Sequence, residues 1–207
     1  TGSKNFSEED INQIVESNSA GLSAFGGRNT IGLILDGLSP SQGELLPVYF
    51  DLLTNPTWDP KILEREKSVQ LEQIKNKHDN PAQMGFQQFH QMMFEGHPYA
   101  RDILGTEASL KHVTHEKMIF YQKQHLQLSN LVMVAVGDFD RKLLELEIEA
   151  LEKKLEKGKP FQAQLMVKKI EHNETQKIKL EKEQTHIVLG YRGLQIQSEE
   201  RYVLDVI

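Results

Sequence analysis

The sequence predicts an α+β protein in which helices pack on an antiparallel or mixed sheet. Segments with apolar residues at helical spacing are interleaved with short extended segments, but the regular strand–helix–strand order of a parallel sheet is absent. The chain has 207 residues, of which 38% are hydrophobic and 26% charged, and this composition provides enough apolar material for a packed core.

The composition also excludes several classes of protein. The chain has no cysteine, so disulfide bonds and thiolate metal sites are ruled out. A formal net charge of −6 disfavours a nucleic-acid partner, because phosphate binding requires an excess of Lys and Arg. No apolar run reaches the ~18 residues of a membrane span, and the polar start does not have the pattern of a signal peptide. We expect a soluble protein and leave the compartment open between periplasm and cytoplasm.

The first part of the chain predicts a helix, a hairpin and a second helix. Ser7 precedes Asp10 by three positions, the spacing of a capping box, and a helix of about three turns is expected to follow. Residues 20–27 and 28–37 are extended and separated by glycines, which favours an antiparallel pair. Residues 39–53 predict a helix with Pro47 close to its start.

Two further helices are expected in the middle of the chain. Residues 59–76 predict a long charged helix that begins at Asp59-Pro60, since proline is favoured at the first helical position. Asn80-Pro81 predicts the start of the next helix. Its apolar side is interpreted as core rather than as a cofactor pocket and comprises Phe86, Phe89, Met93 and Phe94.

The second half of the chain mixes helices with apolar runs. Thr114 is expected to cap a helix, and a further helix is expected from Asp140 to about Leu155. The near-continuous apolar run at residues 130–137 predicts a buried strand, and residues 185–191 predict a second strand. A helix is expected to begin at Ser198, and the polar residues 157–175 predict a connection between two lobes.

Several segments, in the same order along the chain, resemble one enzyme family. Residues 55–73 resemble the helix that supplies the third metal ligand in the insulinase/pitrilysin (M16) family of zinc peptidases, to which mitochondrial processing peptidase is related. Residues 95–99 and 105–114 resemble the loop and the short helix that follow this helix in the family. Residues 120–139 resemble the family's signature helix and buried strand. The strand that opens the next half-unit resembles residues 184–192. The resemblance thus covers nearly the whole chain.

The resemblance implies a two-subdomain organisation. Each family unit is a pair of related subdomains with helices packed on a sheet, and this chain resembles such a unit truncated at both ends. We expect residues 1–156 to form one subdomain, including the metal-site-equivalent helix at residues 59–78. Residues 157–175 would be the connection, and residues 176–207 would begin the next half-unit.

Gln73 decides how the resemblance is interpreted. In the family this helix carries two glutamates seven residues apart. Here Glu66 stands at the first position, whose side chain in the family lies next to the metal ligands without binding the metal. Gln73 stands at the second position, where the family has the metal ligand itself. A neutral amide is a poor ligand for Zn²⁺, which prefers thiolate, imidazole or carboxylate groups. Glu72 does not substitute for it, because neighbouring helix residues point ~100° apart. We expect no metal site and no catalytic residue in this chain.

Further positions are expected to face the substrate. After the first strand the family's catalytic half reads Asn-Ala-x-Thr, whereas the corresponding residues here are Ser23, Ala24, Phe25 and Gly26. We interpret Ser23, Ala24, Phe25 and His97 as candidate substrate-facing residues. For His97, a loop histidine bonded to nearby backbone is the simpler structural alternative.

The resemblance implies the non-catalytic half of an M16 zinc metallopeptidase. The expected partners are a catalytic half, in the same or a separate polypeptide, that carries the zinc, and an unfolded peptide substrate. One alternative is a truncated catalytic half whose His-x-x-Glu-His motif lies upstream of Thr1, with the ligand register misjudged. A second is a structural core subunit without a proteolytic role, as in respiratory complexes.

Overall fold

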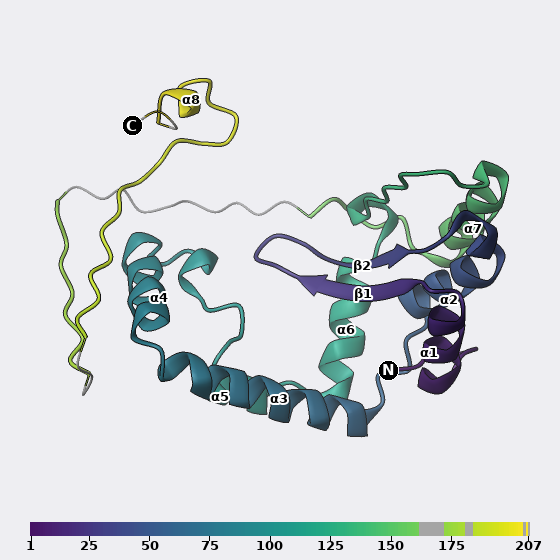
Figure 1. The fold of residues 1–207 in the computed structure, drawn as a ribbon, viewed down its shortest axis with the longest axis horizontal. Coiled ribbons are helices and arrows are strands. Elements are labelled where there is room, and N and C mark those ends of the chain that lie inside the picture. Colours follow the sequence, from purple (N-terminus) through teal and green to yellow (C-terminus); the bar gives the residue numbers. More distant parts are fainter. Residues whose placement is uncertain (162–171, 181–183, 205, 207) are drawn as a thin grey trace. The chain divides into compact units, whose positions relative to one another are not determined.

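The computed structural model describes residues 1–161, 172–180, 184–204 and 206 (Figure 1). The chain divides into two compact units: residues 1–70 with 107–163, and residues 71–106 with 164–207. In chain order the elements are α1 (Glu8–Ser17), β1 (Gly21–Gly26), β2 (Ile31–Asp36), η1 (Ser39–Ser41), α2 (Gln42–Thr54), α3 (Pro60–His78), α4 (Pro81–Met93), η2 (Pro98–Ala100), α5 (Glu107–Lys111), α6 (His115–His125), η3 (Leu128–Asn130), α7 (Arg141–Lys154) and α8 (Arg201–Leu204), where η marks a 3₁₀ turn.

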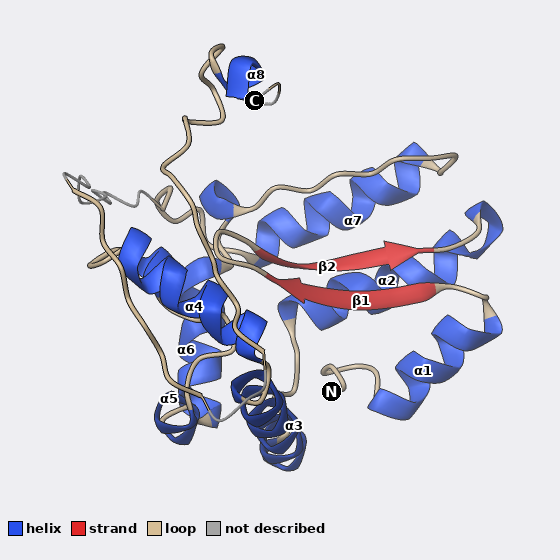
Figure 2. Ribbon diagram, turned by 60° about the vertical axis from the view of Figure 1, so that its left-hand side comes forward, coloured by secondary structure: helices blue, strands red, loops and turns tan. Residues whose placement is uncertain are grey.

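The first unit contains a two-stranded antiparallel sheet with helices packed against it (Figure 2). In the register of the hairpin, Ser23 lies opposite Ile34 and Phe25 opposite Gly32. The Tyr49 hydroxyl of α2 donates a hydrogen bond to the Leu33 carbonyl at 3.3 Å and so ties α2 to β2. The expected α+β class and the expected hairpin are therefore confirmed.

Helix starts follow the capping residues that the sequence indicates. The backbone N–H of Asp10 donates to Ser7 Oγ at 3.1 Å while Ser7 N–H donates to Asp10 Oδ2 at 2.9 Å, which completes the capping box. Asn80 and Thr114 accept the corresponding backbone hydrogen bonds at the starts of α4 and α6. These side chains satisfy N–H groups that a helix leaves unpaired at its first turn.

The hydrophobic core of the first unit lies between α1, α2 and α7. Its centre is Val48 of α2, with a 1% exposed side chain. The other buried apolar side chains of this unit are Ile11, Leu45, Phe50, Leu110 and Leu151. Burial of such side chains contributes about 1.5–3 kcal/mol each, so this helix layer supplies much of the stability of the unit.

In the second unit, α4 packs against the extended residues 184–191. A side chain on Gly190 would bring its Cβ within 2.4 Å of the Phe89 ring, so glycine permits the close approach of this segment to α4. The ammonium group of Lys77, at the end of α3, forms an ion pair with the Asp102 carboxylate. Phe94, His97 and Tyr99 pack together, with ring centroids 4.7 to 6.0 Å apart.

Three predicted elements differ from the structure. Residues 131–136 and 184–191 are extended but belong to no ladder among the described residues, so the predicted strands at 130–137 and 185–191 are wrong. An apolar run indicates a buried strand only when a neighbouring strand is available, and the described residues supply none. The predicted helix from Ser198 is reduced to Arg201–Leu204 within the described residues. The predicted connection at 157–175 falls largely on residues 162–171, which lie outside the described part.

Asp51 anchors the N-terminal segment to α2. Its side chain is 5% exposed and its carboxylate accepts four hydrogen bonds. The donors are Ser3 Oγ at 2.6 Å, Asn5 N and Nδ2 at 2.9 Å, and Asn55 Nδ2 at 2.9 Å. Burial raises the pKa of this carboxyl, but the hydrogen bonds to its charged form outweigh burial and hold the pKa below its ordinary value.

Replacing Asp51 with Asn should lower the free energy of unfolding at pH 7 by about 1–3 kcal/mol, because the amide nitrogen leaves buried donors without an acceptor. Since the folded-state pKa is lowered, the carboxylate stabilises the fold above the unfolded-state pKa. That contribution is lost as the pH falls below about 5. Urea unfolding followed by circular dichroism at several pH values measures both effects.

Asp79→Asn provides the matched control, because its exposed side chain lies at the end of α3 and should leave stability within about 0.5 kcal/mol of the unsubstituted protein. Equal stability of the Asp51→Asn variant and the unsubstituted protein from pH 3 to pH 7 would contradict the anchoring role.

Candidate functional site

The candidate site is built on α3. The helix begins after Asp59, whose Oδ1 accepts the backbone N–H of Lys61 at 2.8 Å. Glu66 and Gln73 are both exposed. Seven residues at 100° each bring them within about 20° of one another, so their side chains leave the same face of the helix. Val69 lies between them on that face and is 45% exposed. The two positions predicted from the sequence are therefore accessible and share one face.

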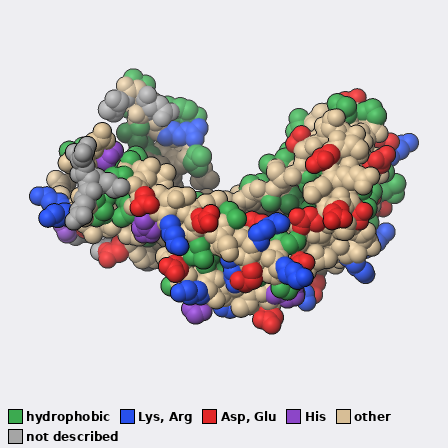
Figure 3. Space-filling model, turned by 60° about the horizontal axis from the view of Figure 1, so that its bottom comes forward, with side chains coloured by type: hydrophobic (Ala, Val, Ile, Leu, Met, Phe, Trp, Pro, Cys, Tyr) green, Lys and Arg blue, Asp and Glu red, His purple; other side chains and the backbone are tan. Residues whose placement is uncertain are grey.

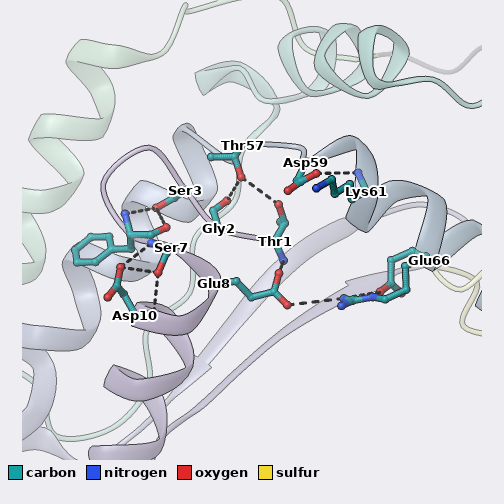
Figure 4. A network of polar contacts seen from close by, with 12 residues as sticks. Thr1, Gly2, Ser3, Ser7, Glu8, Asp10, Thr57, Asp59, Lys61 and Glu66 are labelled. Atoms are coloured by element: carbon teal, nitrogen blue, oxygen red, sulfur yellow. Dashed lines mark hydrogen bonds and ion pairs between the residues drawn. The ribbon is translucent and has the colours of Figure 1, made fainter.

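A chain of ion pairs surrounds Glu66 (Figure 4). The guanidinium group of Arg65 lies 3.0 Å from Glu66 Oε1 and 3.8 Å from Glu8 Oε1. These groups are well exposed, so each pair contributes little to stability, about 0–1 kcal/mol. Their effect is to place a cation directly beside the Glu66 carboxylate.

A cavity of about 240 Å³ adjoins this helix face within the first unit. Its apolar walls come from Trp58, Ile62, Leu63 and Met118, and Thr1, Asp59, Arg65 and Glu66 complete the lining. Its lining thus combines apolar side chains with charged ones.

Trp58 is a site-forming residue that the sequence analysis did not single out. It adopts φ = 49°, a left-handed conformation that is rare for a bulky side chain. Its indole N–H donates to Gln122 Oε1 at 3.0 Å, and Gln122 Nε2 donates to the Leu53 carbonyl at 3.0 Å. The pair fixes the corner between α2 and α3. The sequence feature that could have indicated this role is the position of Trp58 directly before the Asp59-Pro60 helix start.

The donor set on α3 does not suit zinc. Gln73 offers a neutral amide, which is a poor zinc ligand, and Glu66 is already paired with Arg65. Across residues 1–161 and the described parts of 172–206, no three His, Asp or Glu side chains gather in an arrangement that could hold a metal ion. Two histidines three residues apart, His112 and His115, do not form a metal-binding pair. His112 precedes α6 while His115 opens it, so the two rings do not share a helix face.

The candidate substrate-facing residues of the first unit lie on β1. Ser23, Ala24 and Phe25 are all exposed, and the Phe25 ring covers Gly32 on the neighbouring strand. Within the described residues β1 has β2 as its sole sheet neighbour, so the other edge of β1 presents backbone N–H and C=O groups. Such an edge can pair with an extended peptide.

His97 belongs to the second unit and is 8% exposed. Its Nδ1 accepts the backbone N–H of Tyr99 at 3.1 Å, so the ring caps the 3₁₀ turn η2. These contacts match the structural alternative for this loop histidine, and its contact with substrate stays a prediction.

The fold is a helix-rich α+β unit, and α3 presents Glu66 and Gln73 on one exposed face. The sequence profile described as "Insulinase (Peptidase family M16)" matches residues 1–107, and the profile "Peptidase M16 inactive domain" matches residues 112–207. The chain belongs to peptidase family M16.

Curated relatives resemble the chain at low identity. An uncharacterized zinc protease from Rickettsia felis is 26% identical over 164 residues, which cover 79% of this chain and 39% of that protein. An uncharacterized zinc protease from Bacillus subtilis, YmxG, is 28% identical over 163 residues, covering 78% and 39%. Cytochrome b-c1 complex subunit 1 from Bos taurus is 23% identical over 146 residues, covering 70% and 30%.

A solved structure shows the same fold. The crystal structure of a peptidase M16 inactive domain from Pseudomonas fluorescens superposes with a TM-score of 0.74 at 20% identity, covering 81% of this chain and 41% of that one. The chain thus spans less than half the length of the relatives and of the solved structure described above.

Two surface properties bear on partners. No helix among the described residues is long and apolar enough to cross a membrane. On the face in Figure 3, acidic and basic side chains are interspersed, as expected for a chain with a formal net charge of −6. This face shows no basic stripe of the kind that nucleic-acid binding requires.

The Trp58–Gln122 contact can be tested with Trp58→Phe, which keeps an aromatic ring but removes the indole donor. We expect a loss of about 1 kcal/mol in the free energy of unfolding, the usual worth of one such hydrogen bond. A double-mutant cycle with Gln122→Leu, measured by urea unfolding, separates this bond from other changes. Additive effects of the two substitutions would show that the two side chains are not coupled.

Restoring the carboxylate with Gln73→Glu should not create a tight zinc site, because one carboxylate beside an ion-paired glutamate falls short of the three protein ligands of a zinc centre. Zinc measured by plasma mass spectrometry after dialysis should stay far below one equivalent in both the variant and the unsubstituted protein. One equivalent retained by the variant alone would mean that the remaining ligands are already in place.

Proposed function

We propose that the chain is the non-catalytic half of an M16 zinc metallopeptidase and forms part of the chamber that binds peptide. The observation that carries this proposal is Gln73, an amide on the exposed face of α3, at the position that the family resemblance assigns to the metal ligand. The match of residues 112–207 to an inactive-domain profile supports it. The division into residues 1–156, 157–175 and 176–207 remains part of the proposal.

The zinc ion in this proposal belongs to a catalytic partner half, in the same or a separate polypeptide. There the metal would supply an activated water for peptide hydrolysis. This chain's own contribution is to bind and orient the substrate and to exclude bulk water. The names of the relatives from Rickettsia felis and Bacillus subtilis, both zinc proteases, support a peptidase assembly.

An unfolded peptide is the substrate class that suits β1. Its open edge offers backbone hydrogen bonds that do not depend on the peptide's side chains, while Ser23, Ala24 and Phe25 line the exposed strand. Phe25, 45% exposed, adds an apolar contact. Contact of His97 with the substrate is a further part of the proposal, and it requires the ring to become accessible.

A structural core subunit is the second candidate function. The similarity to a subunit named for the cytochrome b-c1 complex, 23% identical over 70% of this chain, favours it. Such a subunit would assemble stably and leave peptide cleavage unaffected. The other alternative, a truncated catalytic half, requires a zinc motif outside residues 1–207 and a second ligand in place of Gln73.

Purified chain should neither cleave an unfolded reporter peptide nor retain zinc after dialysis. Mixed with a catalytic M16 half that alone has weak activity, it should raise cleavage, and Phe25→Asp should reduce that stimulation by about tenfold through loss of an apolar contact and repulsion of acidic peptides. Leu146→Asp, the same kind of substitution on an exposed apolar residue of α7, is the control. Chelator-sensitive cleavage that appears once residues upstream of Thr1 are restored would establish the catalytic alternative, and assembly without stimulation would establish the structural one.

A further inference from the structure

The loop that follows α4 folds back onto the end of that helix (Figure 1). Its 3₁₀ turn η2 begins directly after His97, which is 8% exposed and is the one buried histidine in the described part of the chain. The His97 ring lies against the rings of Phe94 and Tyr99, with centroid distances of 6.0 and 4.7 Å. A titratable ring is thus enclosed between the end of a helix and a short turn.

The hydrogen bond at the start of η2 defines where the His97 ring carries its proton. The backbone N–H of Tyr99 donates to His97 Nδ1 at 3.1 Å. Because a ring nitrogen accepts only through a free lone pair, Nδ1 is unprotonated and the neutral ring carries its proton on Nε2. A second proton would bind to Nδ1 and face the Tyr99 N–H, and two donors cannot bond to each other. The charged ring and the closed turn therefore exclude one another.

His90, in the last turn of α4, shows the opposite arrangement. Its Nδ1 lies 2.8 Å from the Phe86 carbonyl oxygen, which can only accept, so Nδ1 carries the proton. A second proton would bind to Nε2 and leave this hydrogen bond in place. A cation near the end of a helix is also favourable, because the C-terminus of a helix carries a partial negative charge. Protonation thus opposes the closed loop at His97 but not at His90.

The closed loop offers no ion pair to a charged His97 ring. Within the described part of the chain, this ring makes no contact with a carboxylate at ion-pair distance. Asp102, which follows η2, is paired with the ammonium group of Lys77 instead. The titratable and charged residues of the surrounding elements are His90, Glu95, Tyr99, Arg101 and Asp102, with the exposed His186 on the extended segment beside α4.

Gly96 provides a hinge directly before His97. It adopts φ = 77°, a left-handed conformation that glycine accepts without strain, and beyond its chain neighbours no atom lies within 4 Å of the place that a Cβ would take. The turn itself contains two backbone hydrogen bonds of 3.0 Å, from Ala100 N–H to the His97 carbonyl and from Arg101 N–H to the Pro98 carbonyl. Loss of the side-chain cap would therefore weaken a turn that has few other bonds.

We propose that His97 is an acid-sensitive latch, whose neutral ring closes residues 95–101 onto the end of α4 and whose protonation at Nδ1 opens them. Imidazole rings take up a second proton in mildly acidic solution, so the loop is closed at about pH 7.5 and opens as the pH falls towards about 5.5. Opening exposes the rings of Phe94 and Tyr99 together with His97. The inference does not depend on the proposed function, and it names a condition under which the His97 ring becomes accessible.

Amide hydrogen exchange followed by nuclear magnetic resonance tests the latch in the purified chain. Protection factors, corrected for the pH dependence of exchange in unstructured peptides, are compared at about pH 7.5 and about pH 5.5. We expect the protection of the Tyr99 and Ala100 amides to fall by about tenfold in the unsubstituted protein, because the Tyr99 N–H loses its acceptor.

Two variants assign this change to one ring. His97→Asn offers Oδ1 as an acceptor for the same N–H and cannot be protonated, so the protection of Tyr99 should no longer depend on pH. His90→Gln is the matched control, because it removes the neighbouring imidazole and should leave the pH dependence unchanged. Equal protection at both pH values in the unsubstituted protein would overturn the proposal. A fall that persists in His97→Asn, or that disappears in His90→Gln, would assign the change to another group and would also overturn it.

The protonated nitrogen of each ring is an independent readout that needs no substitution. Long-range correlation of ring protons with ring nitrogens by nuclear magnetic resonance distinguishes the two neutral forms of histidine. At about pH 7.5 we expect the proton on Nε2 in His97 and on Nδ1 in His90. A neutral His97 ring with its proton on Nδ1 would overturn the proposal, since that nitrogen could not accept the Tyr99 N–H.

Discussion

The buried carboxylate of Asp51 is the interaction on which the first unit depends. It lies in the last turn of α2 and holds Ser3 and Asn5 of the N-terminal segment. That segment in turn meets the chain after α2, where Ser3 bridges to Pro56 and the Thr57 N–H donates to the Gly2 carbonyl at 3.0 Å. Asp51 thus positions both the start of α1 and the segment that leads into α3. Its buried negative charge is tolerated because hydrogen-bond donors surround the carboxylate.

Local chemistry explains why much of this fold could be predicted from sequence. Ser7, Asn80 and Thr114 each act on N–H groups within three residues of themselves, so their effect is visible without knowledge of the rest of the chain. The hairpin of β1 and β2 is equally local. The α3 helix followed from its Asp59-Pro60 start, and the family resemblance singled out Glu66 and Gln73. Their spacing then placed them on one face, since a helix repeats its direction every 3.6 residues.

Non-local pairing explains the errors. Whether residues 131–136 become a buried strand depends on a neighbour elsewhere in the polypeptide, and the same holds for residues 184–191, where Ile187 and Tyr191 are exposed. Asp51 and Trp58 were missed for a related reason. A single acidic residue in the apolar run of α2, and a tryptophan just before a helix start, gain meaning only when their distant partners Ser3 and Gln122 are known.

The left-handed corner at Trp58 has a spectroscopic consequence. The chain contains one tryptophan, and it lies at the junction between α2 and α3 with its indole N–H bonded to Gln122. Intrinsic indole emission therefore originates from this corner of the first unit alone. Loss of order in α4 lowers the far-ultraviolet helix signal without a local change at this tryptophan, so a loss of helix signal at constant emission reports on the second unit.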